Sequence, residues 1–285
     1  MLTYFQAIII GALQGLTELF PVSSLGHSII LPALFGWHLD ENAEFFLIFL
    51  IATHLATSLV LLGFFWKDWV RVVKGIVLSV IRRRIDPADT YAKLGWLLVI
   101  GTIPAGILGL LFQDQFKSLF SSPVVVSLFL GLNGILLLCA ELLRRKKAAG
   151  EDAQADEQIA AMGFSKAVKI GFAQALALFP GFSRTGSTLG GGLLVGLDHE
   201  SSARFAFLLA TPIILAAAVL KLPELIHNGG SYPIAPVVIG ALISAIAAYL
   251  SVRFLTKYFK TKTLMPFAIY CLATGVLSAL ILLVR

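Results

Sequence analysis

The chain has 285 residues, of which 58% are hydrophobic and only 13% charged, with a mean hydropathy of +0.90. A soluble domain carries roughly a quarter charged residues, so this composition excludes an ordinary soluble protein. The net charge of +6 comes largely from basic residues between apolar segments, which argues against nucleic acid as a partner. We therefore expect an all-α integral membrane protein with a single membrane domain over residues 1–285.

Apolar stretches of about 20 residues predict helices that span the bilayer, because lipid offers the backbone no hydrogen-bond partners. Six stretches qualify, and in chain order they cover about 45–66, 95–112, 123–143, 203–222, 234–252 and 264–284. The polar segments between them, at about 67–94 and 144–166, have the length of loops.

Two further apolar regions, at about 5–36 and 164–197, are interrupted near the middle by Pro, Gly and Ser. The interruptions run from Pro21 to Gly26 and from Pro180 to Gly186. Neither half of either region is long enough to cross the bilayer, so we predict two re-entrant helical hairpins, or four half-helices. Their tips would lie at membrane depth, where irregular backbone is tolerated only inside protein or beside a wet cavity.

Basic residues predict the orientation. Residues 67–94 contain seven Lys and Arg, 144–169 contain six and 253–263 contain four. The six predicted spans place all three segments on one side, which the positive-inside rule identifies as the cytoplasm. Both termini then face outward, and the basic segments face anionic membrane lipid.

An internal repeat links the two hairpins. A shift of 160 positions aligns Gln14 with Gln174, Ser23 with Ser183 and Gly26 with Gly186, and a shift of 158 aligns residues 49–53 with 207–211. Three spans separate the hairpins, so they enter from opposite faces. This predicts an inverted-topology repeat with its site near the midplane. Repeat one covers about 1–143, a cytoplasmic linker about 144–163 and repeat two about 164–285.

The first hairpin contains a potential nucleophile. Gln14 and Glu18 share a helix face, and the break that follows carries Ser23, Ser24 and His27. A serine hydroxyl needs a base to become nucleophilic, and His27 is the candidate, with Glu18 orienting it or holding a metal. The alternative is that Ser and Gly permit close helix packing and that His27 is an interior polar group.

The second hairpin has the composition of a phosphate site. Its break carries a cation among hydroxyls, namely Ser183, Arg184, Thr185, Ser187 and Thr188. The planar guanidinium of Arg184 matches a pair of phosphate oxygens, and a helix N-terminus adds donors. The alternative is a structural ion pair between Arg184 and Glu18. His54, inside a predicted span, is interpreted as a packed polar group that could face the site.

At these residues the chain resembles the undecaprenyl-diphosphate phosphatases of the bacitracin-resistance family. The resemblance runs essentially end to end and rests on Gln14-x-x-x-Glu18, Pro21-Val22-Ser23-Ser24-x-Gly26-His27 and Pro180-Gly181-Phe182-Ser183-Arg184-Thr185-Gly186-x-Thr188. It implies a bacterial inner-membrane enzyme that hydrolyses undecaprenyl diphosphate, a polyprenyl diphosphate lipid, to the monophosphate and inorganic phosphate. That reaction recycles the lipid carrier for cell-wall synthesis, from a site open to the outer (periplasmic) face.

The resemblance also implies roles. Ser24 would be the nucleophile, His27 its base, and Glu18 with Gln14 the ligands of a weakly held divalent cation (Mg²⁺ or Ca²⁺). Phosphate would be bound by Ser183, Arg184 and Thr188, with Ser23, Thr185 and Ser187 as further candidates. The chain departs from the family at Leu25, where a small hydroxyl residue is usual, and at Gln14, where a carboxylate is often found. The second departure leaves one anionic metal ligand in the motif.

The sequence is compatible with two other functions. A transporter or flippase for a polyprenyl phosphate lipid would also use inverted repeats with broken helices. The Ser24–His27 pair favours an enzyme, because transport needs neither a nucleophile nor a base. A purely structural subunit leaves Arg184 among hydroxyls without an explanation. The sequence leaves the oligomeric state open, with a homodimer as one candidate.

Overall fold

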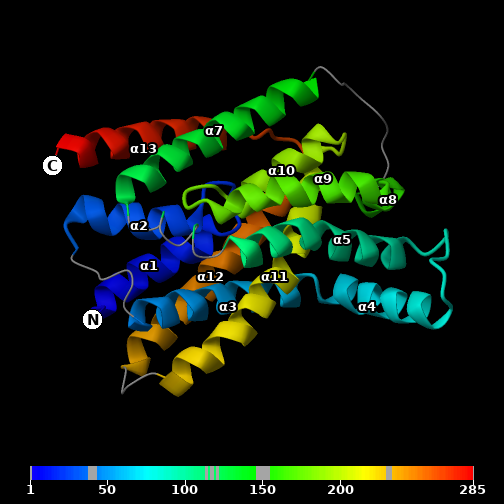
Figure 1. Ribbon diagram of the computed structural model, residues 1–285, viewed down its shortest axis with the longest axis horizontal. Helices are drawn as coiled ribbons and strands as arrows, with labels where there is room; N and C mark the ends of the chain where they lie inside the picture. Colours follow the sequence, from blue (N-terminus) through cyan, green and yellow to red (C-terminus); the bar gives the residue numbers. More distant parts are fainter. Residues whose placement is uncertain are drawn as a thin grey trace.

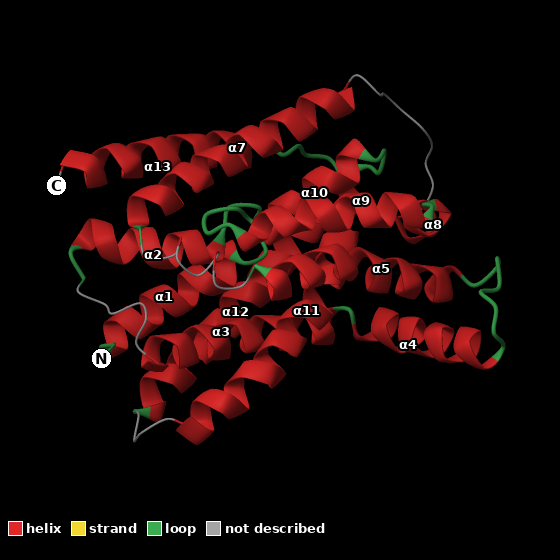
Figure 2. Ribbon diagram, in the orientation of Figure 1, coloured by secondary structure: helices red, strands yellow, loops and turns green. Residues whose placement is uncertain are grey.

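The structure, a computed structural model, describes residues 2–37, 44–112, 115, 119, 122–145, 155–228 and 233–284. All regular elements in these ranges are helical (Figures 1 and 2). Six helices are long and apolar enough to cross a membrane, as predicted. They are α3 (Glu44–Phe64), α5 (Thr90–Leu111), α7 (Pro123–Arg145), α11 (His199–Asn228), α12 (Ile234–Tyr258) and α13 (Met265–Val284). The chain is thus a multi-pass membrane protein.

Four shorter helices occupy the two interrupted apolar regions, as two consecutive pairs. They are α1 (Tyr4–Thr17), α2 (Ser24–Phe35), α9 (Phe164–Ala175) and α10 (Arg184–Leu194), with a short 3₁₀ turn, η1 (Leu176–Leu178), after α9. None exceeds 14 residues. At 1.5 Å per residue each covers well under the bilayer's apolar thickness of about 30 Å. The turns joining each pair lie among the helices in the middle of the molecule (Figure 2).

A serine starts the second helix of each pair. The Ser23 hydroxyl accepts a hydrogen bond from the Gly26 amide (3.2 Å), and the Ser183 hydroxyl accepts one from the Gly186 amide (3.0 Å). These N-caps satisfy backbone donors that the helix itself cannot. Ser23 also has a φ of 69°, which residues other than glycine rarely adopt. The interruptions seen in sequence are therefore capped starts of new helices.

The two tips contact each other, and α7 joins them. The side chain of Asn133 donates to the Pro21 carbonyl (3.0 Å) and accepts from the Ser183 amide (3.1 Å). Glycines permit the approach. A Cβ on Gly26 would lie 3.3 Å from the Gly181 Cα, and one on Gly186 would lie 3.2 Å from the Pro21 carbonyl oxygen.

The first helix of each pair packs against a long helix from the other half of the chain. α1 lies along α12, and α9 lies along α5. Both interfaces depend on a glycine, because a Cβ on Gly11 would collide with the Gly240 backbone and one on Gly171 with the Gly101 carbonyl. Such small residues let helix backbones approach closely inside a membrane.

The prediction of a loop at 67–94 is wrong, because most of the segment forms helix α4 (Trp66–Ile81). One face of α4, with Val72, Gly75 and Ser79, is buried, and Ser79 accepts a hydrogen bond from the Trp96 indole of α5 (2.8 Å). The many basic residues of the segment made it polar on average, so its buried helix face was not predicted. The segment 144–166 likewise contains a helix, α8 (Ala155–Ala161), while residues 146–154 of the expected linker lie outside the described ranges.

Candidate active site

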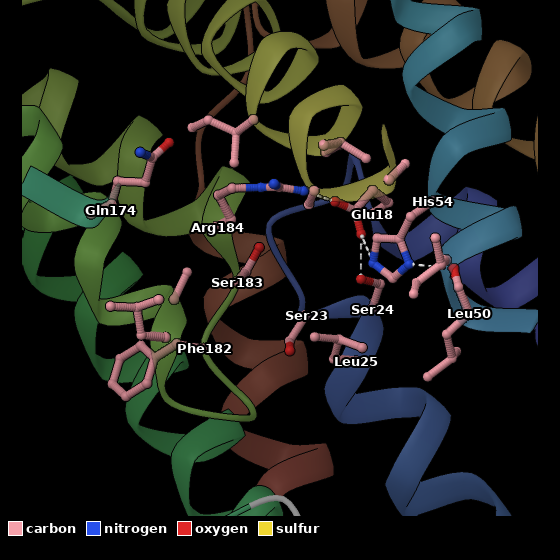
Figure 3. A pocket seen from close by; sticks show the side chains of 18 of the residues that line it. Glu18, Ser23, Ser24, Leu25, Leu50, His54, Gln174, Phe182, Ser183 and Arg184 are labelled. Carbon is pink, nitrogen blue, oxygen red and sulfur yellow. Dashed lines mark hydrogen bonds and ion pairs between the residues drawn. The ribbon is translucent and has the colours of Figure 1, made fainter. Parts of the chain in front are cut away.

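A cavity of about 640 Å³ lies between the two hairpin tips and helices α3, α5 and α11 (Figure 3). Most of its wall is apolar, with residues such as Leu47, Leu178 and Ile213. Its polar side chains are Glu18, Ser23, Ser24, His54, Thr102, Gln174, Ser183 and Arg184. Such a cavity suits an amphiphile whose small polar group enters at one end.

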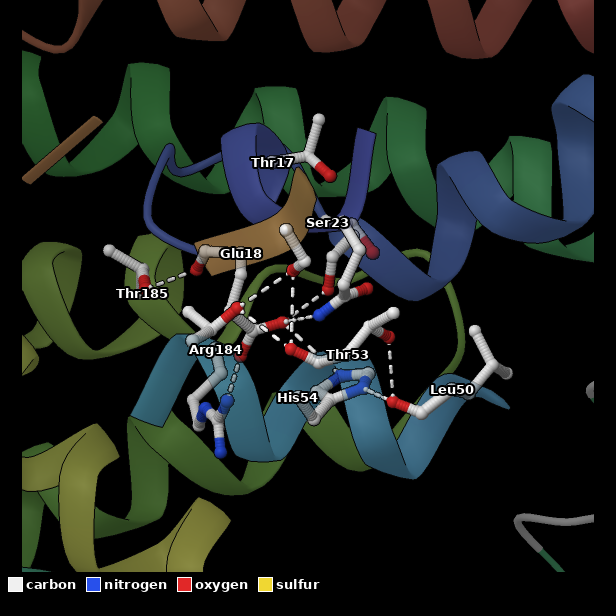
Figure 4. Close-up of polar contacts among 12 residues, drawn as sticks. Thr17, Glu18, Ser23, Leu50, Thr53, His54, Arg184 and Thr185 are labelled. Atoms are coloured by element: carbon white, nitrogen blue, oxygen red, sulfur yellow. Dashed lines mark hydrogen bonds and ion pairs between the residues drawn. The ribbon is translucent and has the colours of Figure 1, made fainter. Parts of the chain in front are cut away.

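Glu18, in the turn after α1, is the centre of the polar contacts (Figure 4). Its Oε1 forms an ion pair with the guanidinium of Arg184, at the start of α10. Its Oε2 accepts hydrogen bonds from the Ser24 hydroxyl (2.5 Å) and the Gln14 amide (2.9 Å). The Glu18 side chain is only 5% exposed. The alternative weighed from sequence, a Glu18–Arg184 pair, is therefore present in this structure.

His54, from α3, contacts the same carboxylate. Its Nε2 lies 3.3 Å from Glu18 Oε2, while its Nδ1 lies 2.7 Å from the Leu50 carbonyl oxygen. A carbonyl can only accept, so Nδ1 carries a proton and the ring orientation is fixed. Sequence reasoning interpreted His54 as a packed polar group that could face the site, and assigned it no chemical role. The only signal available was a histidine inside an apolar span.

The predicted pairing of Ser24 with His27 is not formed. The Nδ1 of His27 bonds the Ser23 carbonyl (2.7 Å), and its Nε2 bonds the Tyr270 hydroxyl of α13 (2.7 Å). On α2 the His27 ring reaches back to the N-cap carbonyl, whereas the Ser24 hydroxyl reaches across the break to Glu18. His27 thus joins the first hairpin to α13 in this structure.

The second hairpin divides its candidate residues. Ser183 and Arg184 line the cavity, but Thr185 does not, because its hydroxyl donates to the Glu18 backbone carbonyl (2.9 Å). The hydroxyls of Ser187 and Thr188 are buried in α10 away from the cavity wall, with no hydrogen-bond partner among the described residues. Asn133 and Gln174 also had no predicted role. Their polarity inside apolar helices, and for Gln174 its alignment with Gln14, were the available signals.

Few of the described side chains could act as ligands of a divalent cation. Within the described ranges, no group of three or more His, Cys, Asp or Glu could hold a metal. Among the described residues, Glu18 supplies the one carboxylate that lines the cavity. The Oε1 of Gln14 is buried without a partner among those residues, so one neutral oxygen beside Glu18 remains available. This set fits an ion that takes its other ligands from water and from substrate phosphate, as Mg²⁺ commonly does.

Comparison with known proteins identifies the family of the chain. The family profile described as Bacitracin resistance protein BacA matches residues 7–277. The undecaprenyl-diphosphatase of Mycolicibacterium paratuberculosis is 46% identical, over 100% of this chain and 99% of its own length. Undecaprenyl-diphosphatase 2 of Frankia alni is 44% identical, over 97% of each chain. Undecaprenyl-diphosphatase 2 of Chromobacterium violaceum is also 44% identical, over 98% of this chain and 99% of its own length. The chain therefore belongs to the BacA bacitracin resistance protein family.

Proposed function

We propose that the cavity at Glu18, Ser24 and Arg184 is where this protein hydrolyses undecaprenyl diphosphate to the monophosphate and inorganic phosphate. The observation that carries the assignment is a hydroxyl, a carboxylate and a guanidinium joined in one network in the wall of a largely apolar cavity. The diphosphate contacts these polar groups, and the polyprenyl chain lies along the apolar wall. The reaction recycles the lipid carrier of cell-wall synthesis.

Substrate binding exchanges one ion pair for another. In the empty site the guanidinium of Arg184 faces the Glu18 carboxylate. A terminal phosphate carries more charge than a carboxylate and matches the guanidinium fork with two oxygens. Arg184 therefore turns to the phosphate, and Glu18 loses the neighbour that most strongly opposes its taking a proton.

Ser24 then acts as the nucleophile. Its proton passes to Glu18 Oε2, which already accepts it in a 2.5 Å hydrogen bond, and its oxygen attacks the terminal phosphorus. The bond from phosphorus to the bridging oxygen breaks, and the lipid monophosphate leaves with the electron pair. Water then attacks the phosphoserine, Glu18 returns the proton to Ser24, and inorganic phosphate is released. Arg184 stabilises the charge of the transferring group in both steps.

His54 acts as a positioning residue for Glu18. The fixed ring holds its Nε2 against the oxygen that receives the Ser24 proton. When Arg184 turns to phosphate, Gln14 and the doubly protonated form of His54 remain as the side-chain donors that keep this carboxylate in place. The role of base, assigned to His27 from sequence, passes to Glu18.

A divalent cation (Mg²⁺ or Ca²⁺) would be held by Glu18 and the free oxygen of Gln14, together with substrate oxygens. When bound, it would neutralise negative charge on the diphosphate. With a single carboxylate ligand the ion would be weakly held. Its support is the unpartnered Gln14 oxygen beside Glu18.

The two helix pairs are re-entrant hairpins of an inverted repeat. Reciprocal contacts support this: Gly26 meets Gly181 and Gly186 meets Pro21, and the shift of 160 positions exchanges the two pairs. The repeat also relates α1 to α9 and α12 to α5, so the packing of α1 on α12 corresponds to the packing of α9 on α5. Transporters share this plan. However, the Ser24 hydroxyl is bonded to the Glu18 carboxylate beside the Arg184 guanidinium, and this arrangement favours hydrolysis over transport.

Replacing Ser24 or Arg184 with Ala should reduce phosphate release from undecaprenyl diphosphate by at least about a thousandfold, because each removes a group that acts in the transition state. Purified variants in detergent should keep the elution volume of the wild type. Near-normal turnover by Ser24→Ala would show that water attacks phosphorus directly. Lipid movement in proteoliposomes without phosphate release would favour the flippase.

His54→Leu should lower kcat at least about tenfold, whereas His54→Gln should keep most of the activity, since an amide N–H can still donate to Glu18. The two kcat values, measured at saturating substrate, test this. Equal loss in both variants would instead make His54 a carrier of protons, and no loss in either would remove it from the site.

Chelation by EDTA should lower phosphate release, and added Mg²⁺ or Ca²⁺ should restore it. Gln14→Glu supplies a second carboxylate and should lower the concentration of cation needed for half-maximal activity. Gln14→Leu is the matched control and should need a higher concentration of cation for half-maximal activity. Activity that is indifferent to EDTA in all three proteins would refute the metal assignment.

The orientation follows from the basic segments, with both termini and the site towards the outer face of the bacterial inner membrane. Arg83, between α4 and α5, should then be cytoplasmic. In a chain lacking Cys139 and Cys271, Arg83→Cys should react with an impermeant maleimide in inverted vesicles and not in intact cells. Labelling in intact cells would reverse the topology.

A further inference from the structure

The carboxamide of Gln174 is a polar group in the wall of the cavity with no partner among the described residues. Gln174 lies in the last turn of α9 and is 2% exposed. Neither of its amide atoms has a hydrogen-bond partner in the described parts of the chain. Each other polar side chain that lines the cavity has a partner: Glu18, Ser23, Ser24, His54, Thr102, Ser183 and Arg184. Leaving a buried amide unpaired costs about 1–3 kcal/mol.

The internal repeat explains why Gln174 is unpaired. Its counterpart in the first hairpin, Gln14, donates to Glu18 four residues later, across one helical turn. Four residues after Gln174 the chain has Leu178, which also lines the cavity. The second hairpin thus keeps the amide and lacks the carboxylate that would bind it.

A diphosphate provides hydrogen-bond acceptors for the Gln174 amide. The terminal phosphate is bound by Arg184 and attacked by Ser24, while the second phosphate stays on the lipid and needs donors of its own. The amide group offers two N–H donors without charge. The Nε of Arg184 is also unpartnered among the described residues. In Figure 3, Gln174 lies on the side of Arg184 opposite Glu18 and Ser24.

We propose that Gln174 is a binding residue for the phosphate that remains attached to the lipid, so that the cavity has two phosphate subsites. The Ser24 side of Arg184 takes the group that is transferred, and the Gln174 side takes the group that is retained. Because the retained phosphate is also the phosphate of the product, Gln174 binds substrate and product alike. The inference rests on the proposed hydrolysis at Ser24.

Gln174→Met is the test, because methionine keeps the length of the side chain and removes both polar atoms. We expect KM for undecaprenyl diphosphate and Ki for undecaprenyl monophosphate to rise together by about tenfold or more, the loss typical of a hydrogen bond to a charged group. The kcat should change by less than about threefold, since substrate and transition state lose the same contact. Removing an unpaired amide should also leave Tm unchanged or higher.

Thr102→Val is the matched control, because the Thr102 hydroxyl lines the same cavity and is already bonded to the Leu98 carbonyl. It should leave KM and Ki unchanged. Gln174→Glu, which repels phosphate, should raise both constants further than Gln174→Met. Unchanged KM and Ki in both Gln174 variants, or a lower Tm with a loss confined to kcat, would overturn the assignment. A wild-type protein that releases no phosphate would overturn the proposed function itself.

Discussion

The ion pair between Glu18 and Arg184 is the contact on which the arrangement of the two hairpins depends. Each residue lies at a helix break, Glu18 after α1 and Arg184 at the start of α10. An unpaired charge at membrane depth is expensive, whereas a paired one with further hydrogen bonds is tolerated. Glu18 therefore holds the second hairpin through two contacts. Its carboxylate pairs with Arg184, and its backbone carbonyl accepts a hydrogen bond from the Thr185 hydroxyl. The chemistry and the packing share the same residues.

Broken helices make this arrangement possible. A continuous helix satisfies its backbone internally and leaves no free N–H groups in the membrane, while a capped start inside the protein places side chains and amides around one point. Ser23 and Ser183 serve as these caps and also line the cavity. Asn133 holds both tips from α7. The long helices act as the frame, and the short ones supply the polar groups.

Much of this could be predicted from sequence, because membranes impose simple rules on length and polarity. The six spans and the two interrupted regions follow from apolar length alone, and Glu18, Ser24 and Arg184 follow from their polarity at the breaks. The partner of Ser24 could not be predicted. Spacing along the chain suggested His27, but the direction of the Ser24 hydroxyl is set by the turn before α2, which brings Glu18 closer.

Helix α4 and His54 show what else could not be predicted from the sequence. The basic residues of α4 raised its polarity above that of a span, although Val72, Gly75 and Ser79 repeat at helical spacing on its buried face. His54 could be placed in α3 from sequence, but its facing Glu18 depends on how α3 packs beside the first hairpin. Sequence patterns therefore located the elements, and only the packing between elements identified the contacts of the site.

The separation of the two charged partners along the chain has a consequence for how the protein is made. Glu18 and Arg184 are 166 positions apart. At typical synthesis rates of about 5–20 residues per second, the ribosome needs roughly ten to thirty seconds to supply the second after the first. Throughout that interval the nascent chain carries the Glu18 carboxylate without Arg184, its partner in the folded protein. Final burial of the first hairpin therefore depends on translation of the second, and assembly is governed by the later half of the polypeptide.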